Sequence, residues 1–525
     1  MKTKNTLCIL LVIIMLMSLG ACGKTPAPSS TASTNTSAET QTEYRLTAKL
    51  TPADTESKSL AAHLDETAVI SFTNTSSDTW ERVCLRDYAA SNLELENDMG
   101  GEYTPGSIRE VLDSAGNTLK FEAQKDKSVV YVTLSSPLRP GERTTVTVDY
   151  STEIPCGGER LCWYPSGDYG SKSVTCLSQA YPMLAEYIDG KWNETPYFAD
   201  GECFYSRCAS FEMTLSVPDG CTVVSTGSET QSADGTWTLK ADKVRDFAVI
   251  VGESFEKLTA RVGDVTVNSY YSAASDGDKK QGEISLKSAV DAVNAFEEAW
   301  GKYPYDTLDV VQAPYNYGGM EYPGMVRIAA SYAGSLELED EVDKNLRLDV
   351  AHEVAHEWFY AAVGNDQYRE AWLDESFAVY GEYVYQLYTG ESESDVRERV
   401  MAFDGALPQK YIDLSAGEYF DEGTGYGDYI NAVYKVGPQF LWKLRQAMGA
   451  GSFDAFMQAW YTEHMFKEVT TSDFREAIEK AAPGGEVKVL ITEYLSPTRY
   501  DKNKIVQKQE FIDSCFISAY NCRET

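Results

Sequence analysis

The sequence predicts an α+β protein with several domains: an all-β domain of the sandwich or saddle type, followed by a mixed α/β, largely helical domain. Three observations predict it. The 525 residues exceed the length of one ordinary domain. Apolar and polar residues alternate from about residue 45 to 255, whereas apolar residues recur at helical spacing from residue 284 onward. We therefore expect a β-rich domain over residues 45–255 and a second domain over residues 256–497.

The strands of the first domain are predicted by alternation between turn signals. The segments SVVYVTL (128–134), TTVTVDY (144–150), SFEMTLSV (210–217) and TWTLKA (236–241) place every second side chain on the same face. Turn sequences such as RPGE and PDG separate such segments. This pattern predicts packed β-sheets over roughly 200 residues.

The helices of the second domain are predicted by apolar residues three and four apart and by the glycines that follow them. Two helices are expected at 343–364 and 370–390, each ending at a glycine. A strand (308–314) and a glycine-rich, then strand-like segment (317–331) precede them. Further helices are expected over residues 284–301, 429–449, 452–465 and 472–481.

The N-terminus resembles the leader of an exported lipoprotein. Lys2 and Lys4 precede an apolar run at residues 7–17, which is short for a membrane span but has the length of a signal-peptide core. The sequence LGAC (19–22) then resembles a bacterial lipobox, in which Cys22 would receive the lipid. A plain signal peptide with an incidental cysteine is the alternative. We expect a signal peptide over 1–22 and a lipid anchor on the extracytoplasmic side of a bacterial cell membrane.

The two other terminal segments and the net charge of the chain are interpreted in the same way. Residues 23–44 are rich in Ser, Thr, Ala and Pro, and this composition predicts a flexible tether. Residues 498–525 have no assignment from their pattern. The formal net charge of −34 argues against nucleic acid as a partner and is typical of a soluble protein outside the cell. No pattern indicates the oligomeric state.

Two of the four histidines lie in the segment DVAHEVAHEWF (349–359). Residues four apart on a helix lie one above the other, about 5–6 Å apart at Cβ, so His352 and His356 can bind one cation. Zinc suits imidazole ligands, and a catalytic zinc takes three protein ligands and a water. Glu353 can accept a proton from that water, which is the chemistry of the HExxH pattern. An ordinary helix with two histidines is the alternative.

Glu375 is the expected third ligand. Eighteen residues separate it from His356, which is enough to finish one helix, turn, and begin an antiparallel second helix. A carboxylate there completes a two-histidine, one-glutamate set for one zinc ion per chain. A solvated glutamate at a helix start is the alternative interpretation. Glu382, seven residues later on the same helical face, either orients a histidine or lies exposed.

Three ordered motifs resemble the membrane-alanyl-aminopeptidase family of gluzincins. They are HEVAH (352–356) with WLDESFA (372–378) after it, GGMEY (318–322) upstream, and YKVG (434–437) downstream. The resemblance implies a thermolysin-like catalytic domain behind a β domain, peptide substrates, and hydrolysis of the N-terminal peptide bond.

The resemblance also implies a role for each matching residue. Glu321 would bind the free α-amine of the peptide. The backbone of Gly318, Gly319 and Met320 would pair with the peptide as an added strand. The Tyr434 hydroxyl would donate to the oxyanion that forms at the scissile carbonyl.

Gln179 matches a family position in the β domain that lines the first specificity pocket and helps to bind the amine. An ordinary polar strand residue is the alternative interpretation of Gln179. Members of the family usually have asparagine where this chain has Tyr322, and lysine two residues after the tyrosine of the downstream motif, where this chain has Val436.

Three hypotheses follow for the function. The first is a lipid-anchored, zinc-dependent aminopeptidase. The second is a gluzincin endopeptidase, which is favoured by Tyr322 and by the few residues after the catalytic domain, since these predict an open cleft. The third is a non-catalytic, surface-binding lipoprotein, which has no need of Glu353 or Tyr434.

Overall fold

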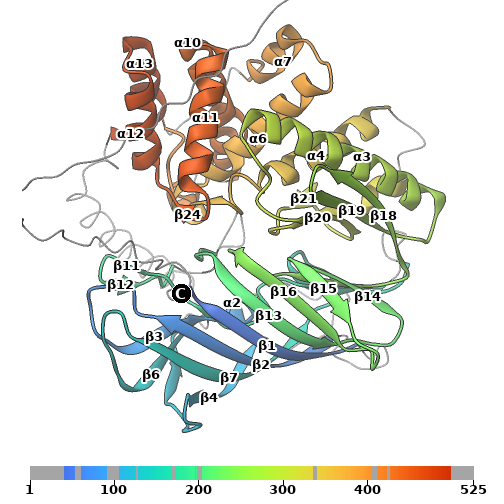
Figure 1. The fold of residues 1–525 in the computed structure, drawn as a ribbon, viewed down its shortest axis with the longest axis vertical. Coiled ribbons are helices and arrows are strands. Elements are labelled where there is room, and N and C mark those ends of the chain that lie inside the picture. Colours follow the sequence, from blue (N-terminus) through green and yellow to red (C-terminus); the bar gives the residue numbers. More distant parts are fainter. Residues whose placement is uncertain are drawn as a thin grey trace, which may run out of the picture. The chain divides into compact units, whose positions relative to one another are not determined.

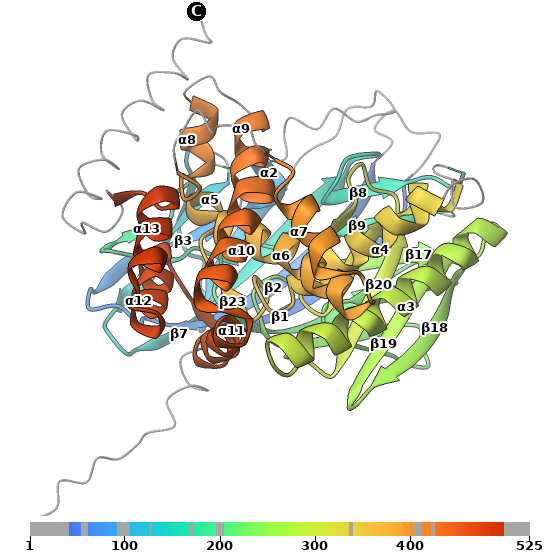
Figure 2. The same ribbon diagram turned by 90° about the horizontal axis from the view of Figure 1, so that it is seen from above.

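A computed structural model describes the chain from residue 41 to residue 497, with internal gaps (Figures 1 and 2). The lipobox with Cys22, the signal peptide, most of the tether and the tail over 498–525 lie outside the described residues. The described ranges are 41–53, 61–91, 106–125, 128–167, 173–195, 197, 201, 204–334, 340–403, 411–421 and 426–497. No helix within these ranges has the length and apolar character that a bilayer crossing needs.

The first half of the described chain forms β-sheets, as the alternation predicts. The largest has the order β15 (Ser228–Gln231), β16 (Trp237–Val244), β13 (Ala209–Ser216), β1 (Glu43–Thr51), β2 (Ala62–Thr73), β7 (Arg143–Ile154), β4 (Ser107–Asp113). A second sheet has the order β10 (Met183–Leu184), β3 (Trp80–Arg86), β6 (Val129–Leu138), β5 (Phe121–Ala123). A third has the order β14 (Cys221–Ser225), β17 (Val249–Glu253), β9 (Val174–Leu177), β8 (Leu161–Tyr164). Two short elements complete this half, the hairpin β11 (Tyr187–Ile188) with β12 (Lys191–Trp192), and the single turn α2 (Tyr88–Ser91).

The second half contains one mixed sheet and most of the helices. The sheet has the order β18 (Phe255–Val262), β19 (Val265–Ser272), β20 (Thr307–Ala313), β22 (Met325–Ala329), β21 (Gly319–Met320), so β21 is an edge strand. Helices α3 (Asp276–Ala299) and α4 (Asp340–Ala355) pack on this sheet (Figure 2). The fold class is therefore confirmed: all-β sheets come first, followed by a mixed and largely helical part.

The remaining elements follow in chain order. They are the 3-10 turn Ala330–Gly334, β23 (Val363–Gly364), α5 (Gln367–Glu370), α6 (Trp372–Tyr388), α7 (Glu393–Val400), α8 (Ala416–Asp421), α9 (Tyr426–Ile430), the π-helix Asn431–Val436, α10 (Gly437–Met448), α11 (Ala450–His464), β24 (Lys467–Glu468), α12 (Thr471–Ala481) and α13 (Gly485–Tyr494).

The helix expected over residues 343–364 ends at Ala355 instead, directly before His356. Three backbone bonds beyond this point join residues five apart, among them Ala361 N–H to the His356 carbonyl at 2.9 Å. Tyr360 has a φ of 129°, which no helix accommodates. Apolar residues continue in the sequence beyond Ala355 because that whole segment is buried, and not because it is helical.

The helix expected over residues 429–449 is also divided. Its first part, Asn431–Val436, is a π-helix, and the N–H of Gly437 donates to the Ala432 carbonyl. The sequence did not predict this widened turn. It is the most important of the unpredicted elements because it contains Tyr434. Such turns insert one extra residue into a helix and often lie at functional sites.

Arg245 of the β-sheet part holds the segment after α4 in place. Its buried guanidinium donates to the carbonyls of Tyr360 and Lys467, each at 2.8 Å, and pairs with Glu468 at 2.6 Å. A side chain on Gly364 would overlap this guanidinium. Since the segment begins at His356, one buried cation fixes the end of the histidine helix against both halves of the fold.

Candidate metal centre

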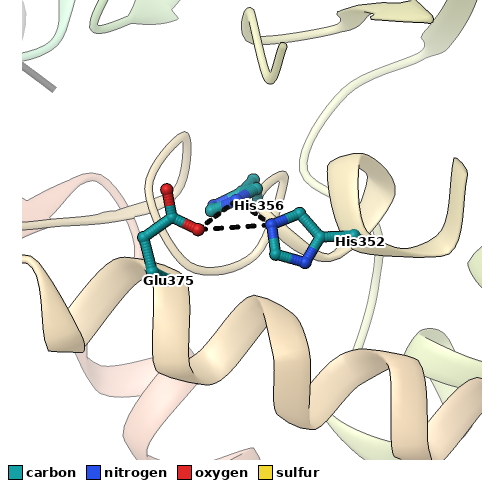
Figure 3. Close-up of side chains that lie close together, drawn as sticks. All are labelled: His352, His356 and Glu375. Carbon is teal, nitrogen blue, oxygen red and sulfur yellow. Dashed lines mark hydrogen bonds and ion pairs between the residues drawn. The ribbon is translucent and has the colours of Figure 1, made fainter. Parts of the chain in front are cut away.

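The site lies where α4 and α6 approach each other closely. Gly381 on α6 has no side chain, and a Cβ atom there would lie 2.5 Å from the Cβ of Ala355 on α4. This approach brings Glu375 of α6 opposite the two histidines at the end of α4 (Figure 3). The close helix contact therefore depends on a glycine that the sequence motifs do not include.

The three predicted ligands converge on one point. His352 Nε2 lies 3.2 Å from His356 Nε2 and 3.2 Å from Glu375 Oε2, and His356 Nε2 lies 3.6 Å from the same carboxylate oxygen (Figure 3). Zinc ligands at about 2.0–2.2 Å in tetrahedral geometry lie about 3.3–3.6 Å from one another. The spacing of the three donor atoms therefore fits one zinc ion without rearrangement.

The ring nitrogens that face away from this point also have partners. His352 Nδ1 lies 2.9 Å from Glu382 Oε1, so the structure brings the predicted positioning residue to the first histidine. His356 Nδ1 lies 2.5 Å from Asp374 Oδ1 and 3.2 Å from the carbonyl oxygen of Phe359. Both contacts leave Nε2 of each ring as the metal-binding atom.

Sequence reasoning missed Asp374. Its only signal is its position directly before Glu375, and paired acids at a helix start are usually solvated. Here Asp374 is completely buried, and Gln367 donates to its other oxygen. A buried acid with both a histidine and an amide as neighbours is part of the site and not of the surface.

The charges around the site favour a cation. Burial acts to raise the pKa of Glu375, but hydrogen bonds from His352 and His356 outweigh it and hold that pKa well below its usual value. Burial acts to lower the pKa of both imidazoles, but Glu375 and Glu382 raise the pKa of His352, and Asp374 that of His356. This carboxylate-rich surrounding stabilises positive charge at the point where the three ligands meet.

Glu353 lies where a general base is needed. It is 6% exposed, and burial raises its pKa to about 8, while the charges of His352 and His356 act in the opposite direction. Single donor atoms of Glu321, Glu353 and His356 lie within 4.8 Å of one another. The predicted amine-binding residue, the predicted base and one metal ligand therefore surround a common space.

The edge strand β21 explains the two glycines of the upstream motif. A Cβ atom on Gly319 would overlap the side chain of Glu353, and one on Gly318 would overlap the Asp349 carboxylate. The carbonyl of Gly318 accepts from Ala329 N–H on β22 at 3.0 Å. In an antiparallel ladder the next residue, Gly319, directs its backbone groups to the other, free edge. Of the three residues predicted to pair with peptide, Gly319 therefore faces the free edge.

The side chain of Met320 lies apart from that free edge. It is 3% exposed and packs in an apolar cluster with Tyr315 and Tyr322. Arg160 donates to its sulfur at 3.2 Å.

Tyr322, the departure from the family pattern, packs against the β-sheet part. Its side chain is 2% exposed, and its hydroxyl hydrogen-bonds to Ser178 of the β-sheet part. Gln179, next to Ser178, is buried, and its amide donates to Asp246 at 3.0 Å. Tyr322 therefore links the motif to the loop that carries Gln179.

Glu357, a second residue missed by sequence reasoning, holds the other side of this motif. Its two carboxylate oxygens accept from the N–H of Gly324 at 2.9 and 3.0 Å, and Tyr303 donates to one of them at 3.1 Å. Glu357 is completely buried one residue after His356. It therefore joins the histidine segment to the turn that follows Glu321.

Tyr434 stands beside the first histidine. Its ring lies 6.2 Å from the ring of His352, with only 15° between the two planes. Ser376 of α6 donates to the carbonyl of Val433 at 2.6 Å, and a Cβ atom on Gly437 would overlap this hydroxyl. The glycine of the downstream motif thus lets the tyrosine segment lie directly against the helix that carries Glu375.

A β-sheet part, a mixed part and a helix pair bearing two histidines and a glutamate form the arrangement that the resemblance to gluzincins implies. Residues 284–494 match the peptidase family M1 domain. Over these residues the chain is similar to this family of peptidases.

The chain is also similar to individual proteins over part of its length. The chain is 24% identical over 289 residues to aminopeptidase N of Streptomyces lividans, covering 52% of this chain and 34% of that one. It is 22% identical over 433 residues to human aminopeptidase B, covering 74% and 60%. The chain thus spans less than two-thirds of the length of these relatives. The crystal structure of an M1 zinc metallopeptidase from Deinococcus radiodurans shares the fold, with a TM-score of 0.61, 18% identity, and coverage of 87% of this chain and 94% of that one.

Proposed function

We propose that the protein is a zinc-dependent aminopeptidase that hydrolyses the N-terminal bond of peptides. The observation that carries the proposal is the proximity of Glu321, Glu353 and His356, whose donor atoms lie within 4.8 Å of one another beside a free sheet edge. A carboxylate this close to the base binds an α-amine where only the first peptide bond reaches the metal. The names of its relatives, aminopeptidases N and B, support the same activity.

Each residue of the site has its own role in the reaction. His352, His356 and Glu375 would hold the zinc ion, which when bound polarises the scissile carbonyl and acidifies water. Glu353 takes a proton from the attacking water and later returns it to the departing amine. Tyr434 donates to the oxygen that gains negative charge. Gly319 aligns the peptide by backbone hydrogen bonds.

The direction of Tyr322 favours cleavage from the N-terminus over internal cleavage. Tyr322 was one of two observations behind the endopeptidase alternative; the other was an open cleft. Its hydroxyl hydrogen-bonds to Ser178 of the β-sheet part, and its side chain is 2% exposed. Tyr322 therefore serves as a packing residue between the motif and the β-sheet part.

The test of the mechanism is Glu353→Gln in the purified, zinc-loaded protein. We expect zinc to remain at one ion per chain and the hydrolysis of aminoacyl p-nitroanilides to fall by at least about a thousandfold. Glu398→Gln, which changes an exposed glutamate on α7, is the matched control and should keep full activity. Full activity of the Glu353 variant, or no stoichiometric zinc in the wild type, would overturn the proposal.

A second experiment separates aminopeptidase from endopeptidase activity. The same peptide is offered with a free and with an acetylated N-terminus. If Glu321 binds the amine, acetylation removes the positive charge and cleavage should fall by at least about a hundredfold. Equal cleavage of the two peptides would favour the endopeptidase.

We further propose that the chain is anchored by lipid at Cys22 on the extracytoplasmic side of a bacterial membrane. Support comes from the two lysines, the apolar run at residues 7–17 and the LGAC sequence at 19–22. Expression of the full chain in a bacterium with radiolabelled palmitate tests it. Label should enter the wild type and be absent from Cys22→Ser, and unlabelled wild type would contradict the anchor.

A further inference from the structure

Asp349 lies one helical turn before the catalytic residues, on the same face of α4. It precedes Glu353 by four residues, so the two side chains are neighbours along the helix, about 6 Å apart in axial position. The edge strand repeats this order: Gly319 lies against Glu353, and Gly318 lies against Asp349. Asp349 is therefore displaced from the base in the same direction as Gly318 is displaced from Gly319.

This order sets the position of Asp349 relative to a bound peptide. The proposed amine site is Glu321, and the proposed base beside Gly319 marks the scissile bond. A peptide pairing with β21 continues from Glu321 past Gly319 toward Gly318, antiparallel to the strand. The residue directly after the scissile bond, the second residue of the substrate, thus reaches Asp349.

Asp349 has the chemistry of a cation-binding residue. It is half-buried, and the hydroxyl of Tyr332 donates to its Oδ2. Within the described part of the chain, no lysine or arginine forms an ion pair with it; the neighbouring cation Arg347 pairs with Asp343 at 2.5 Å. The charged groups that act on it are His352, the carboxylate of Glu382 and, one turn further along the helix, Glu353.

We propose that Asp349 selects peptides with lysine or arginine as their second residue, by accepting hydrogen bonds from the cationic end of that side chain. This inference rests on the proposed aminopeptidase function and specifies its substrate class. A partly desolvated carboxylate without a basic partner gains from a cation that the substrate brings. A lysine side chain is long enough to cover the axial distance of about 6 Å between Glu353 and Asp349.

The experiment compares hydrolysis of Ala-Lys-Ala, Ala-Gln-Ala and Ala-Glu-Ala by the zinc-loaded wild type and by Asp349→Asn. We expect the wild type to prefer the lysine peptide over the glutamine peptide by at least about tenfold in kcat/KM, mainly through KM, and to cleave the glutamate peptide most slowly. In Asp349→Asn the lysine-to-glutamine ratio should fall to within about twofold.

The control is Glu398→Gln on α7. This change removes an equal charge from an exposed glutamate, so it corrects for long-range electrostatics and should keep the tenfold ratio. A wild type that cleaves the lysine and glutamine peptides equally overturns the proposal even if the Asp349 variant does not fold. An unchanged ratio in a folded Asp349→Asn overturns it as well.

A binding measurement separates this inference from the proposed function. Calorimetry with Glu353→Gln measures the affinity for the three peptides without turnover, alone and combined with Asp349→Asn. Tighter binding of Ala-Lys-Ala that is lost in the double variant supports the role of Asp349. If the wild type cleaves none of the three peptides, the aminopeptidase proposal fails; if it cleaves them all at similar rates, only the role of Asp349 fails.

Discussion

His356 Nδ1 lies 2.5 Å from Asp374 Oδ1, and both side chains are buried, with 1% and 0% of their surface exposed. The equivalent contact of His352, to Glu382 at 2.9 Å, is more open, because 21% of the glutamate side chain is exposed. The two histidines proposed to bind the metal are thus oriented by carboxylates of the same helix, α6, that also supplies Glu375. The orientation of all three ligands therefore depends on the position of α6.

Removing either carboxylate should weaken zinc binding. We expect Glu382→Gln and Asp374→Asn each to lower zinc affinity by about 10–100-fold, with the larger loss for Asp374 because its contact is fully buried. Competition with a chromophoric chelator measures this. Glu398→Gln, which alters an exposed glutamate of α7, is the control. An Asp374 variant that binds zinc as tightly as the wild type would show that the 2.5 Å contact has no orienting role.

Gly437→Ala should displace Tyr434 without touching the metal. The new methyl group overlaps the Ser376 hydroxyl, so the π-helical turn must move away from α6. We expect stability to fall by about 1–3 kcal/mol and kcat to fall with zinc content unchanged. The double variant Gly437→Ala with Ser376→Ala removes the overlapping oxygen and should recover part of both losses. No recovery in the double variant would mean that the hydroxyl of Ser376 is not the group that displaces the turn.

Glu357→Ala should loosen the turn after the amine-binding residue. It leaves the buried N–H of Gly324 without its acceptor, at a cost of about 1–3 kcal/mol. Because Glu321 lies three residues before this turn, we expect KM for free-amine substrates to rise more than kcat falls. Glu357→Gln retains an acceptor oxygen and is the conservative control. A variant whose kcat falls while KM is constant would place Glu357 in the chemistry instead.

Spacing predicted the metal ligands, but it could not predict their supports. His352, His356 and Glu375 follow from helical geometry and from the length of chain that a helix reversal needs. Asp374 and Glu357 did not follow, because the sequence does not show that an acid directly beside a metal ligand is also buried. That burial depends on packing between elements, such as the contact between α4 and α6 near Gly381.

Elements long enough to show a repeating pattern of apolar residues were predictable from the sequence, and shorter elements were not. Strands such as β7 and β13 alternate over eight or more residues and were found within a few residues of their ends. The two-residue strands β10, β11 and β12 are too short to show an alternation of apolar and polar residues. The helix through Trp358 and Tyr360 was wrong because complete burial makes every position apolar, which removes the contrast that distinguishes a helix from a buried turn.

Asp309 should make the stability of the catalytic part depend on pH. It lies on β20, where burial raises its pKa to about 7, the nearby charge of Glu229 adds to the rise, and a hydrogen bond from Asn268 opposes it. The pKa in the folded protein therefore exceeds the value of 3.8 for the free side chain. For an acid this means that folding is favoured at low pH, and that the advantage is lost as the pH rises through about 7, where the buried carboxylate must ionise.

Asp309→Asn removes this ionisation and keeps the shape of the side chain. Relative to the wild type, the variant should gain about 2–3 kcal/mol in the free energy of unfolding between pH 5 and pH 8. Urea denaturation at both pH values measures the difference. Asp306→Asn removes an exposed carboxylate from the same segment and corrects for the change in net charge. If the wild type and Asp309→Asn lose stability in parallel between the two pH values, the carboxyl group of Asp309 does not titrate in this range, and the polarity of its surroundings must be higher than its burial implies.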